Sequence, residues 1–208
     1  QPCAALVSYI RIYQPELIPY LAPVDSPLMH TVKMVKDGFP EYRDAAFVFI
    51  SPCFGKKREF EDNGVKGFNV TFTSIGEYFG RNAIDAAAFP PTPFSNPEPE
   101  RGTGFPLPGG LTVAVLREAP EIFSSIKRIE GDGVFGYFRE LPSSIDDGSA
   151  PLLIDCLSCG SGCCGGTGAF LEGPVSADSR EKKVRTRRAG LTERNHRAVN
   201  IPLFRPRT

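Results

Sequence analysis

Apolar and polar residues along the first part of the chain follow a helical spacing. Residues 2–13 carry apolar side chains at mixed helical intervals, which predicts a first helix. A second helix is predicted from about residue 27, because Ser26 can cap it and Pro27 suits a first helical position. Gly38 then marks its end.

Two short apolar runs, "AAFVFISPC" and "FNVTFT", read as buried strands, and the first of them ends at Cys53. Ser74 and Glu77 have the spacing of a capping box, which predicts the start of a third helix. Residues 110–126 are predicted to be largely helical, and residues 126–140 alternate enough to include strands. The run "PLLID" is a further buried strand, and it ends where a group of cysteines begins.

The arrangement of these elements predicts an α/β fold with largely parallel strands, because helices alternate with short apolar strands. Residues 89–110 are rich in proline and glycine, so we expect a long surface connection there. Ligand-bearing loops in such folds lie at the carboxyl ends of the strands. Cys53 and the run "CLSCGSGCC" both fall at such positions, so distant cysteines could share one site.

The composition is that of a globular chain: 41% of the 208 residues are hydrophobic, which can supply a core. No apolar run reaches the length of about 18 residues that a membrane span needs, and no leader pattern is present, so we expect a cytoplasmic location and no membrane partner. The sequence begins at Gln1 and Cys3 is already a functional candidate. We therefore expect further chain upstream.

Charge divides the chain into two parts, although the 24 basic and 24 acidic residues balance overall. Residues 178–208 hold ten Lys or Arg and three Asp or Glu, which leaves residues 1–177 acidic. We predict a domain over residues 1–177 and a basic tail over residues 178–208 that is weakly structured or docks a partner. A nucleic-acid partner is not expected, because the tail has one aromatic residue, Phe204, and no recognition motif.

Six cysteines in such a chain indicate metal ligands or redox groups, with disulfides as the alternative. Zinc prefers paired Cys-x-x-Cys knuckles, and only Cys156 with Cys159 has that spacing. A 4Fe–4S cluster needs four thiolates and tolerates irregular spacing. Four candidates are available, and both metals stay open at this point: Cys3, Cys53, Cys159 and Cys163.

Three stretches of the sequence resemble, in order, the three cysteine motifs in the catalytic domain of the FeFe hydrogenase large subunit. They are "QPCAALVSYIRIYQPELIPYLAPVDSP", "FVFISPCFGKKREF" and "LLIDCLSCGSGCCGGTG", and the resemblance runs over residues 1–172. The form of the first and last motifs is similar to a divergent branch proposed to be sensory. The resemblance implies two small α/β lobes with short, mostly parallel sheets and a cluster site between them.

The resemblance also implies the cofactors. The four candidate cysteines would hold a 4Fe–4S cluster, and Cys163 would also bridge to a di-iron unit bearing carbon monoxide and cyanide. Lys56 would then hydrogen-bond a cyanide ligand. Ser51 could donate a hydrogen bond to the di-iron unit or cap a turn. Cys156 and Cys164 have no ligand role in the pattern and could be second thiols near the cluster or buried residues.

Departures from the pattern shape the expected activity. Catalytic members carry a proton-relaying cysteine where this chain has Pro2, and methionines where it has Ser51 and Leu157. We therefore expect hydrogen or redox sensing or slow hydrogen turnover, with hydrogen or protons as substrate. A hydrogenase-like oxidoreductase would use a ferredoxin-type electron acceptor, in upstream ferredoxin-like domains or a separate redox partner. The alternatives are a non-enzymatic iron–sulfur carrier or assembly factor without the di-iron unit, and a zinc-stabilised interaction module.

Overall fold

Two small parallel sheets organise the fold. In the first, β1 (Phe47–Ser51) pairs with β2 (Gly67–Thr71), and in the second, β3 (Ile126–Glu130) pairs with β4 (Leu153–Leu157). The structure, a computed structural model, describes residues 2–92, 102–169 and 176–191. This mixed α/β arrangement with short parallel strands confirms the predicted fold class.

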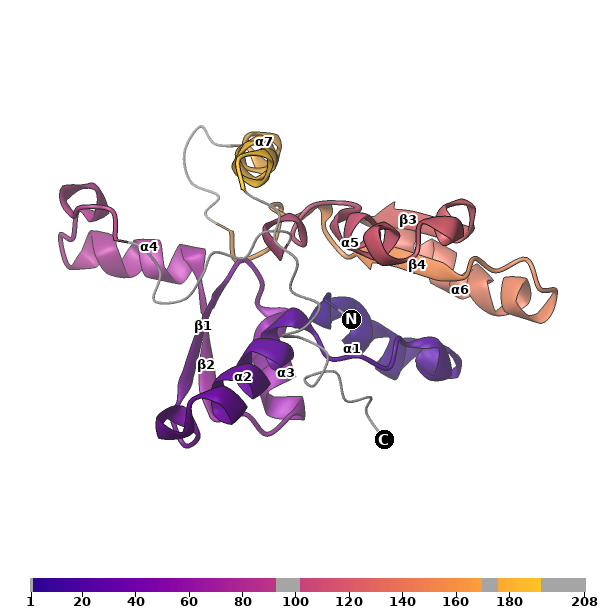
Figure 1. Cartoon of the computed structure of the whole chain (residues 1–208), viewed down its shortest axis with the longest axis horizontal. Coiled ribbons are helices and arrows are strands. Elements are labelled where there is room, and N and C mark those ends of the chain that lie inside the picture. Colours follow the sequence, from indigo (N-terminus) through magenta and orange to yellow (C-terminus); the bar gives the residue numbers. More distant parts are fainter. Residues whose placement is uncertain (1, 93–101, 170–175, 192–208) are drawn as a thin grey trace.

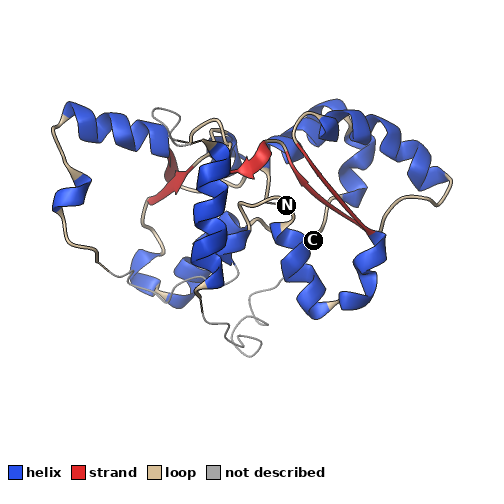
Figure 2. Cartoon of the chain, turned by 90° about the horizontal axis from the view of Figure 1, so that it is seen from above, coloured by secondary structure: helices blue, strands red, loops and turns tan. Residues whose placement is uncertain are grey.

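Most of the α-helices lie beside these sheets (Figures 1 and 2). Within the described residues the remaining α-helices and strand, which short 3-10 helices accompany, are α1 (Ala4–Tyr13), α2 (Pro27–Gly38), α3 (Gly55–Asp62), α4 (Phe72–Arg81), α5 (Gly110–Glu118), α6 (Gly133–Asp146), β5 (Gly160–Cys163) and α7 (Ala177–Ala189). Helix α4 extends away from the sheets, and α7 lies apart from them. Figure 1 shows α2 and α3 next to β1 and β2, and α5 and α6 next to β3 and β4. Helix α1 lies between the two groups.

Helix α1 is held from both sides. Its buried residues Leu6 and Ile10 pack with Val134 and Phe138 of α6 in the larger hydrophobic core, where Val134 is fully buried. Toward α3, the Arg11 guanidinium donates to the Asp62 carboxylate at 3.0 Å. Because Cys3 is the N-cap residue of α1, these contacts also fix the position of that cysteine.

The smaller core joins α2 and α3 to one face of the first sheet. Met29 and Val32 of α2 pack with Phe60 of α3, and Phe47 and Phe49 of β1 lie against them. These two phenylalanines are two positions apart, so they share a face of the strand, as the period of a β-strand requires. The same core therefore sets the direction in which β1 delivers Cys53.

A buried carboxylate ties α5 to β4 in the second group. Asp155, which is 4% exposed, accepts hydrogen bonds from both the N–H and the hydroxyl of Thr112, at 2.8 and 2.7 Å. Two donors compensate the cost of removing one carboxylate oxygen from water. The strand that leads to Cys159 is fixed in this way.

Most of the predicted elements are confirmed, among them the first two helices and the strands that became β1, β2 and β4. Ser26 caps α2 as predicted, since its hydroxyl accepts from the Met29 N–H. The predicted start of the third helix was wrong. Thr71 caps α4 and accepts from the Ser74 N–H at 3.1 Å, so Ser74 lies inside the helix.

Two other predictions are correct only in part. Residues 126–140 were expected to include strands, and β3 confirms this, but most of the rest of the stretch is helical, because α6 begins at Gly133. Its glycines and Pro142 weaken the helical signal, and packing against α1 outweighs propensity. The expected surface connection over 89–110 includes Leu107, which is 2% exposed, while residues 93–101 lie outside the described part.

The basic segment differs from the expectation of weak structure in its first part, because Ala177–Ala189 form α7 with Ser176 as the N-cap. The division at residue 178 stays a prediction, and residues 192–208 lie outside the described part. Among the described residues, no helix combines the length and apolar character that crossing a membrane requires.

The larger core predicts a clear difference between two phenylalanines. Phe138→Ala should lower the free energy of unfolding by about 3–5 kcal/mol, because it leaves a cavity beside α1. Phe123→Ala removes a ring that is 64% exposed and should change that free energy by less than about 0.5 kcal/mol. Denaturant unfolding of both variants measures the difference, and equal losses would contradict the assignment of the core.

Candidate metal centre

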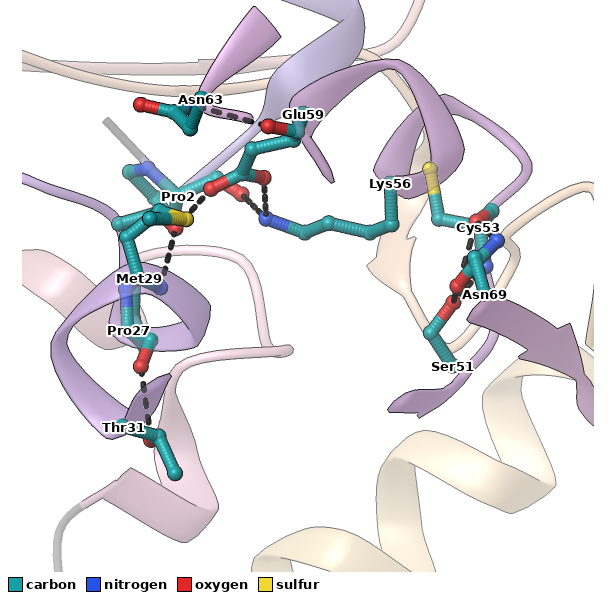
Figure 3. Close-up of polar contacts among 11 residues, drawn as sticks. Pro2, Pro27, Met29, Thr31, Ser51, Cys53, Lys56, Glu59, Asn63 and Asn69 are labelled. Atoms are coloured by element: carbon teal, nitrogen blue, oxygen red, sulfur yellow. Dashed lines mark hydrogen bonds and ion pairs between the residues drawn. The ribbon is translucent and has the colours of Figure 1, made fainter. Parts of the chain in front are cut away.

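The turn after β1 carries Cys53 and is fixed by side-chain hydrogen bonds (Figure 3). The Ser51 hydroxyl accepts from the Cys53 N–H at 3.2 Å and donates to Asn69 Oδ1 at 2.7 Å. Asn69 Nδ2 donates to the Cys53 carbonyl at 2.8 Å. Ser51 thus has the contacts of a turn-capping residue, and a bond to a di-iron unit stays a prediction. Sequence reasoning missed Asn69, whose only signal is a lone amide inside an apolar strand.

Cys163 is the last residue of β5 and lies against a distant segment; we call β5 with the residues that follow it, up to residue 169, the Cys163 loop. The Cys163 N–H donates to the Pro106 carbonyl at 2.8 Å. Gly162, just before it, has a φ of 58°, a left-handed conformation that favours glycine. Pro106 belongs to the proline-rich segment that was expected to be a surface connection, so sequence reasoning missed this contact too.

The Cys163 loop also lies directly against the turn that carries Cys53. The Gly168 N–H donates to the Pro52 carbonyl at 2.8 Å. A Cβ atom on Gly166 would lie 2.3 Å from the same carbonyl oxygen, which is too close for any side chain. Since Pro52 immediately precedes Cys53, this approach places the two cysteine-bearing loops side by side.

The start of α1 meets the start of α3 in the same region. A Cβ atom on Gly55 would lie 3.4 Å from Cys53 Sγ and 3.5 Å from the backbone nitrogen of Ala5. Lys56 Nζ donates to the Pro2 carbonyl at 3.0 Å. The segment that carries Cys3 is therefore next to the turn that carries Cys53.

We refer to the cysteines Cys3, Cys53, Cys159 and Cys163 as the four predicted ligands. Burial is the main cause that raises the pKa of Cys163 to about 12, and the charges of the other three predicted ligands raise it further. Burial also raises the pKa of Cys159, and the charges of Cys3 and Cys53 add to the effect. The structure therefore brings the four predicted ligands close enough for their charges to interact. Their role as ligands stays a prediction.

The basic residues beside Cys53 differ in their surroundings. Lys56 is 12% exposed, and its ammonium donates to Pro2 and pairs with the Glu59 carboxylate. It also lowers the pKa of Cys163. Lys57 and Arg58 are mainly exposed, at 77% and 54%, and pair with carboxylates of their own helix. Of these three residues, Lys56 is the one whose charge acts on a predicted ligand.

The remaining two cysteines have separate environments. Burial raises the pKa of Cys156 to about 12, with a further contribution from the charge of Cys3. Cys156 also lines an apolar cavity of about 560 Å³ between α1, α6 and β4. Cys164 is buried, and its carbonyl accepts from Arg180 Nε at 2.8 Å, which ties α7 to the Cys163 loop.

A site for a single metal ion is not formed in the described part of the chain, where no three or more His, Cys, Asp or Glu side chains make a group that could hold one. A structural zinc ion needs four ligands at tetrahedral corners around one point. A 4Fe–4S cluster offers each thiolate a different iron, so its ligands can be farther apart.

Comparison with known proteins gives a family match. Residues 2–167 match the family described as the iron only hydrogenase large subunit, C-terminal domain. A search of curated proteins finds no match.

Solved structures of FeFe-hydrogenases are similar in fold. One comes from a study of oxygen inactivation through modification and degradation of the H cluster 2Fe subcluster. It has a TM-score of 0.72 at 18% identity, and the match covers 97% of this chain and 68% of that structure. An apo variant of the FeFe-hydrogenase HydA1 from Chlamydomonas reinhardtii has a TM-score of 0.71 at 18% identity, and the match covers 97% of this chain and 69% of that structure. A third, from a study of stepwise H-cluster assembly in HydA, has a TM-score of 0.66 at 18% identity, and the match covers 88% of this chain and 64% of that structure. The chain thus spans about two thirds of the length of these structures.

The raised pKa values predict that metal uptake depends on pH. Thiols must lose their protons to bind metal, and burial keeps Cys159 and Cys163 protonated at neutral pH. Each displaced proton should raise the apparent association constant for Fe²⁺ about tenfold between pH 7 and pH 8. Anaerobic Fe²⁺ titrations at both pH values measure this. Uptake that is independent of pH would contradict it, and Cys163→Ser should weaken the dependence.

Proposed function

Because the chain belongs to the family of the C-terminal domain of the iron-only hydrogenase large subunit, we propose that its four predicted ligands hold one 4Fe–4S cluster. The observation that supports the proposal is that the segments carrying Cys3, Cys53 and Cys163 pack against one another. Thiolates are the usual ligands of iron–sulfur clusters. The close packing at Gly166 further supports a shared site, because it holds two of the loops at a fixed separation.

A di-iron unit with carbon monoxide and cyanide would adjoin the cluster through the Cys163 thiolate. Lys56 would donate to a cyanide: an ammonium has three N–H donors, and its contacts with Pro2 and Glu59 use two of them. When bound, the di-iron unit supplies the heterolytic cleavage of hydrogen, and the 4Fe–4S cluster supplies the path for electrons.

The proposed role is hydrogen or redox sensing, or slow hydrogen turnover. Pro2 occupies the position of the proton-relaying cysteine, and proline has no group that titrates. Its carbonyl oxygen is bound by Lys56, so this residue offers the site no proton. Slow proton delivery favours a sensor over a fast catalyst.

Electrons require a partner, and we propose a ferredoxin-type carrier, either in upstream domains or as a separate protein of the cytoplasm. Helix α7 lies against the Cys163 loop through Arg180, and it exposes Lys182 and Lys183. A basic surface this near to a proposed cluster ligand would attract an acidic electron carrier.

The second candidate is an iron–sulfur carrier or assembly factor that lacks the di-iron unit. It is favoured by the contacts of Ser51 and Lys56, whose polar groups are bonded to the protein itself. Both candidates share the 4Fe–4S cluster, and they differ only in the second unit.

Infrared spectroscopy of the full chain, made together with the maturation machinery, separates these candidates. Carbonyl and cyanide bands are expected if the di-iron unit is bound, whereas iron and sulfide without these bands would favour the carrier. Cys53→Ala should remove iron and bands alike, because it deletes one of the four predicted ligands. Cys156→Ala is the matched control and should keep both. A colourless protein that binds zinc alone would contradict both candidates.

Restoring the missing thiol should raise activity if the di-iron unit is present. Pro2→Cys is expected to increase hydrogen evolution by about tenfold or less, which corresponds to about 1.4 kcal/mol of barrier. Gas-chromatographic assays of matured protein measure this. A parent that already evolves hydrogen rapidly and a variant that is no faster would show that protons reach the site by another route.

A further inference from the structure

The Glu59 carboxylate is largely shielded from water beside the proposed cluster site and has partners on both oxygens (Figure 3). Its side chain is 11% exposed. The Ser26 hydroxyl donates to Oε1, and Lys56 Nζ donates to Oε2. Asn63 Nδ2 donates to the Glu59 backbone carbonyl at 2.7 Å. Sequence reasoning did not single out Glu59, although its spacing from Lys56 on one helix was visible.

The partners of Glu59 belong to three different segments. Ser26 is the N-cap of α2, and Lys56 lies in the first turn of α3. Through Lys56 the contact extends to the Pro2 carbonyl, directly before Cys3. One carboxylate therefore connects the starts of α1, α2 and α3 around the turn that carries Cys53.

The setting differs from that of an ordinary ion pair on a helix surface. On the same helix, Lys57 and Glu61 also pair, but their side chains are 77% and 62% exposed. Exposed pairs of that kind are screened by water and contribute little. A buried carboxylate with two bonded oxygens holds its partner more firmly, because an unpaired ammonium or carboxylate there would be costly.

The ion pair with Glu59 restrains the position of the Lys56 ammonium. The charge of this ammonium acts on the Cys163 thiol, which would become an anion when metal binds, and an unrestrained lysine side chain would move toward that anion. Glu59 offers a competing negative charge on the side of Pro2.

We infer that Glu59 is a positioning residue that holds the Lys56 ammonium at the Pro2 carbonyl, with one N–H left for a cofactor ligand, and prevents it from pairing directly with the cluster thiolates. The inference rests on the proposed function, since it concerns the loaded site. It assigns Glu59 a role through Lys56 and no contact with the cofactor.

The test separates the effect of the Glu59 charge from that of its side-chain length. It uses the full chain after anaerobic loading with iron and sulfide. Glu59→Gln removes the charge, and Glu59→Asp keeps the charge but shortens the side chain by one methylene. Both should raise the reduction potential of the cluster, because the freed ammonium moves closer to it and stabilises the reduced form. Glu61→Gln and Glu61→Asp are the matched controls on the same helix and should leave the potential unchanged.

The dependence on Lys56 is tested in a second background. With Lys56→Met present, Glu59→Asp should no longer shift the potential, because the group that moves is absent. Glu59→Gln should keep only the direct effect of removing a negative charge, so its shift should be smaller than in the parent background. Potentials come from redox titrations followed by electron paramagnetic resonance.

The contradicting outcomes are distinct. A Glu59→Asp variant with the parent's potential, or a Glu59→Asp shift that persists undiminished in the Lys56→Met background, would overturn the inference and leave the cluster proposal intact. A parent chain that takes up no iron and sulfide would overturn the proposed function and this inference with it.

Discussion

The hydrogen bond from the Gly168 N–H to the Pro52 carbonyl joins two loops on which the candidate site depends. One loop carries Cys53 and the other carries Cys163. The contact leaves no room for a Cβ on Gly166, so the glycines of this region are a consequence of packing between loops. If the loops separated, the thiols would no longer lie within reach of one cluster.

Helix α1 supplies the third side of the site. It brings Cys3 to the same region because its apolar face packs on α6 while its start contacts α3. The cysteines there are partly buried, and the pKa of Cys163 is raised to about 12. Protonated thiols held together in this way do little for the stability of a metal-free fold. The proposed cluster would give the grouping a purpose, because metal binding replaces the thiol protons and offsets the charge of the thiolates.

Sequence patterns predicted the elements that have strong local signals. Helix α2 has a capping serine and a proline at its start, and β1 is a continuous apolar run, so both could be located from the sequence. Helix α3 was not predicted, because it is short and mostly polar and is held by contacts with α1 and α2. Helix α6 contains glycines and a proline, and only its packing reveals it.

The same limit applies to the site. The cysteines and Lys56 could be named from their motifs, since each motif is contiguous. Asn69, Pro106 and Glu59 could not, because each acts on a residue of another segment: the Cys53 carbonyl, the Cys163 N–H and the Ser26 hydroxyl. Long-range partners of this kind carry no local sequence pattern, and they become visible only when the fold brings the segments together.

The central claim is that four cysteines from separate segments hold a single iron–sulfur cluster. Crystals of the anaerobically reconstituted chain, measured at the iron absorption edge, test it most directly. The account predicts one compact anomalous peak bounded by the sulfur atoms of Cys3, Cys53, Cys159 and Cys163. Iron bound at Cys156 or Cys164 instead, or distributed over separate sites with any of the four sulfurs remote from it, would contradict the claim.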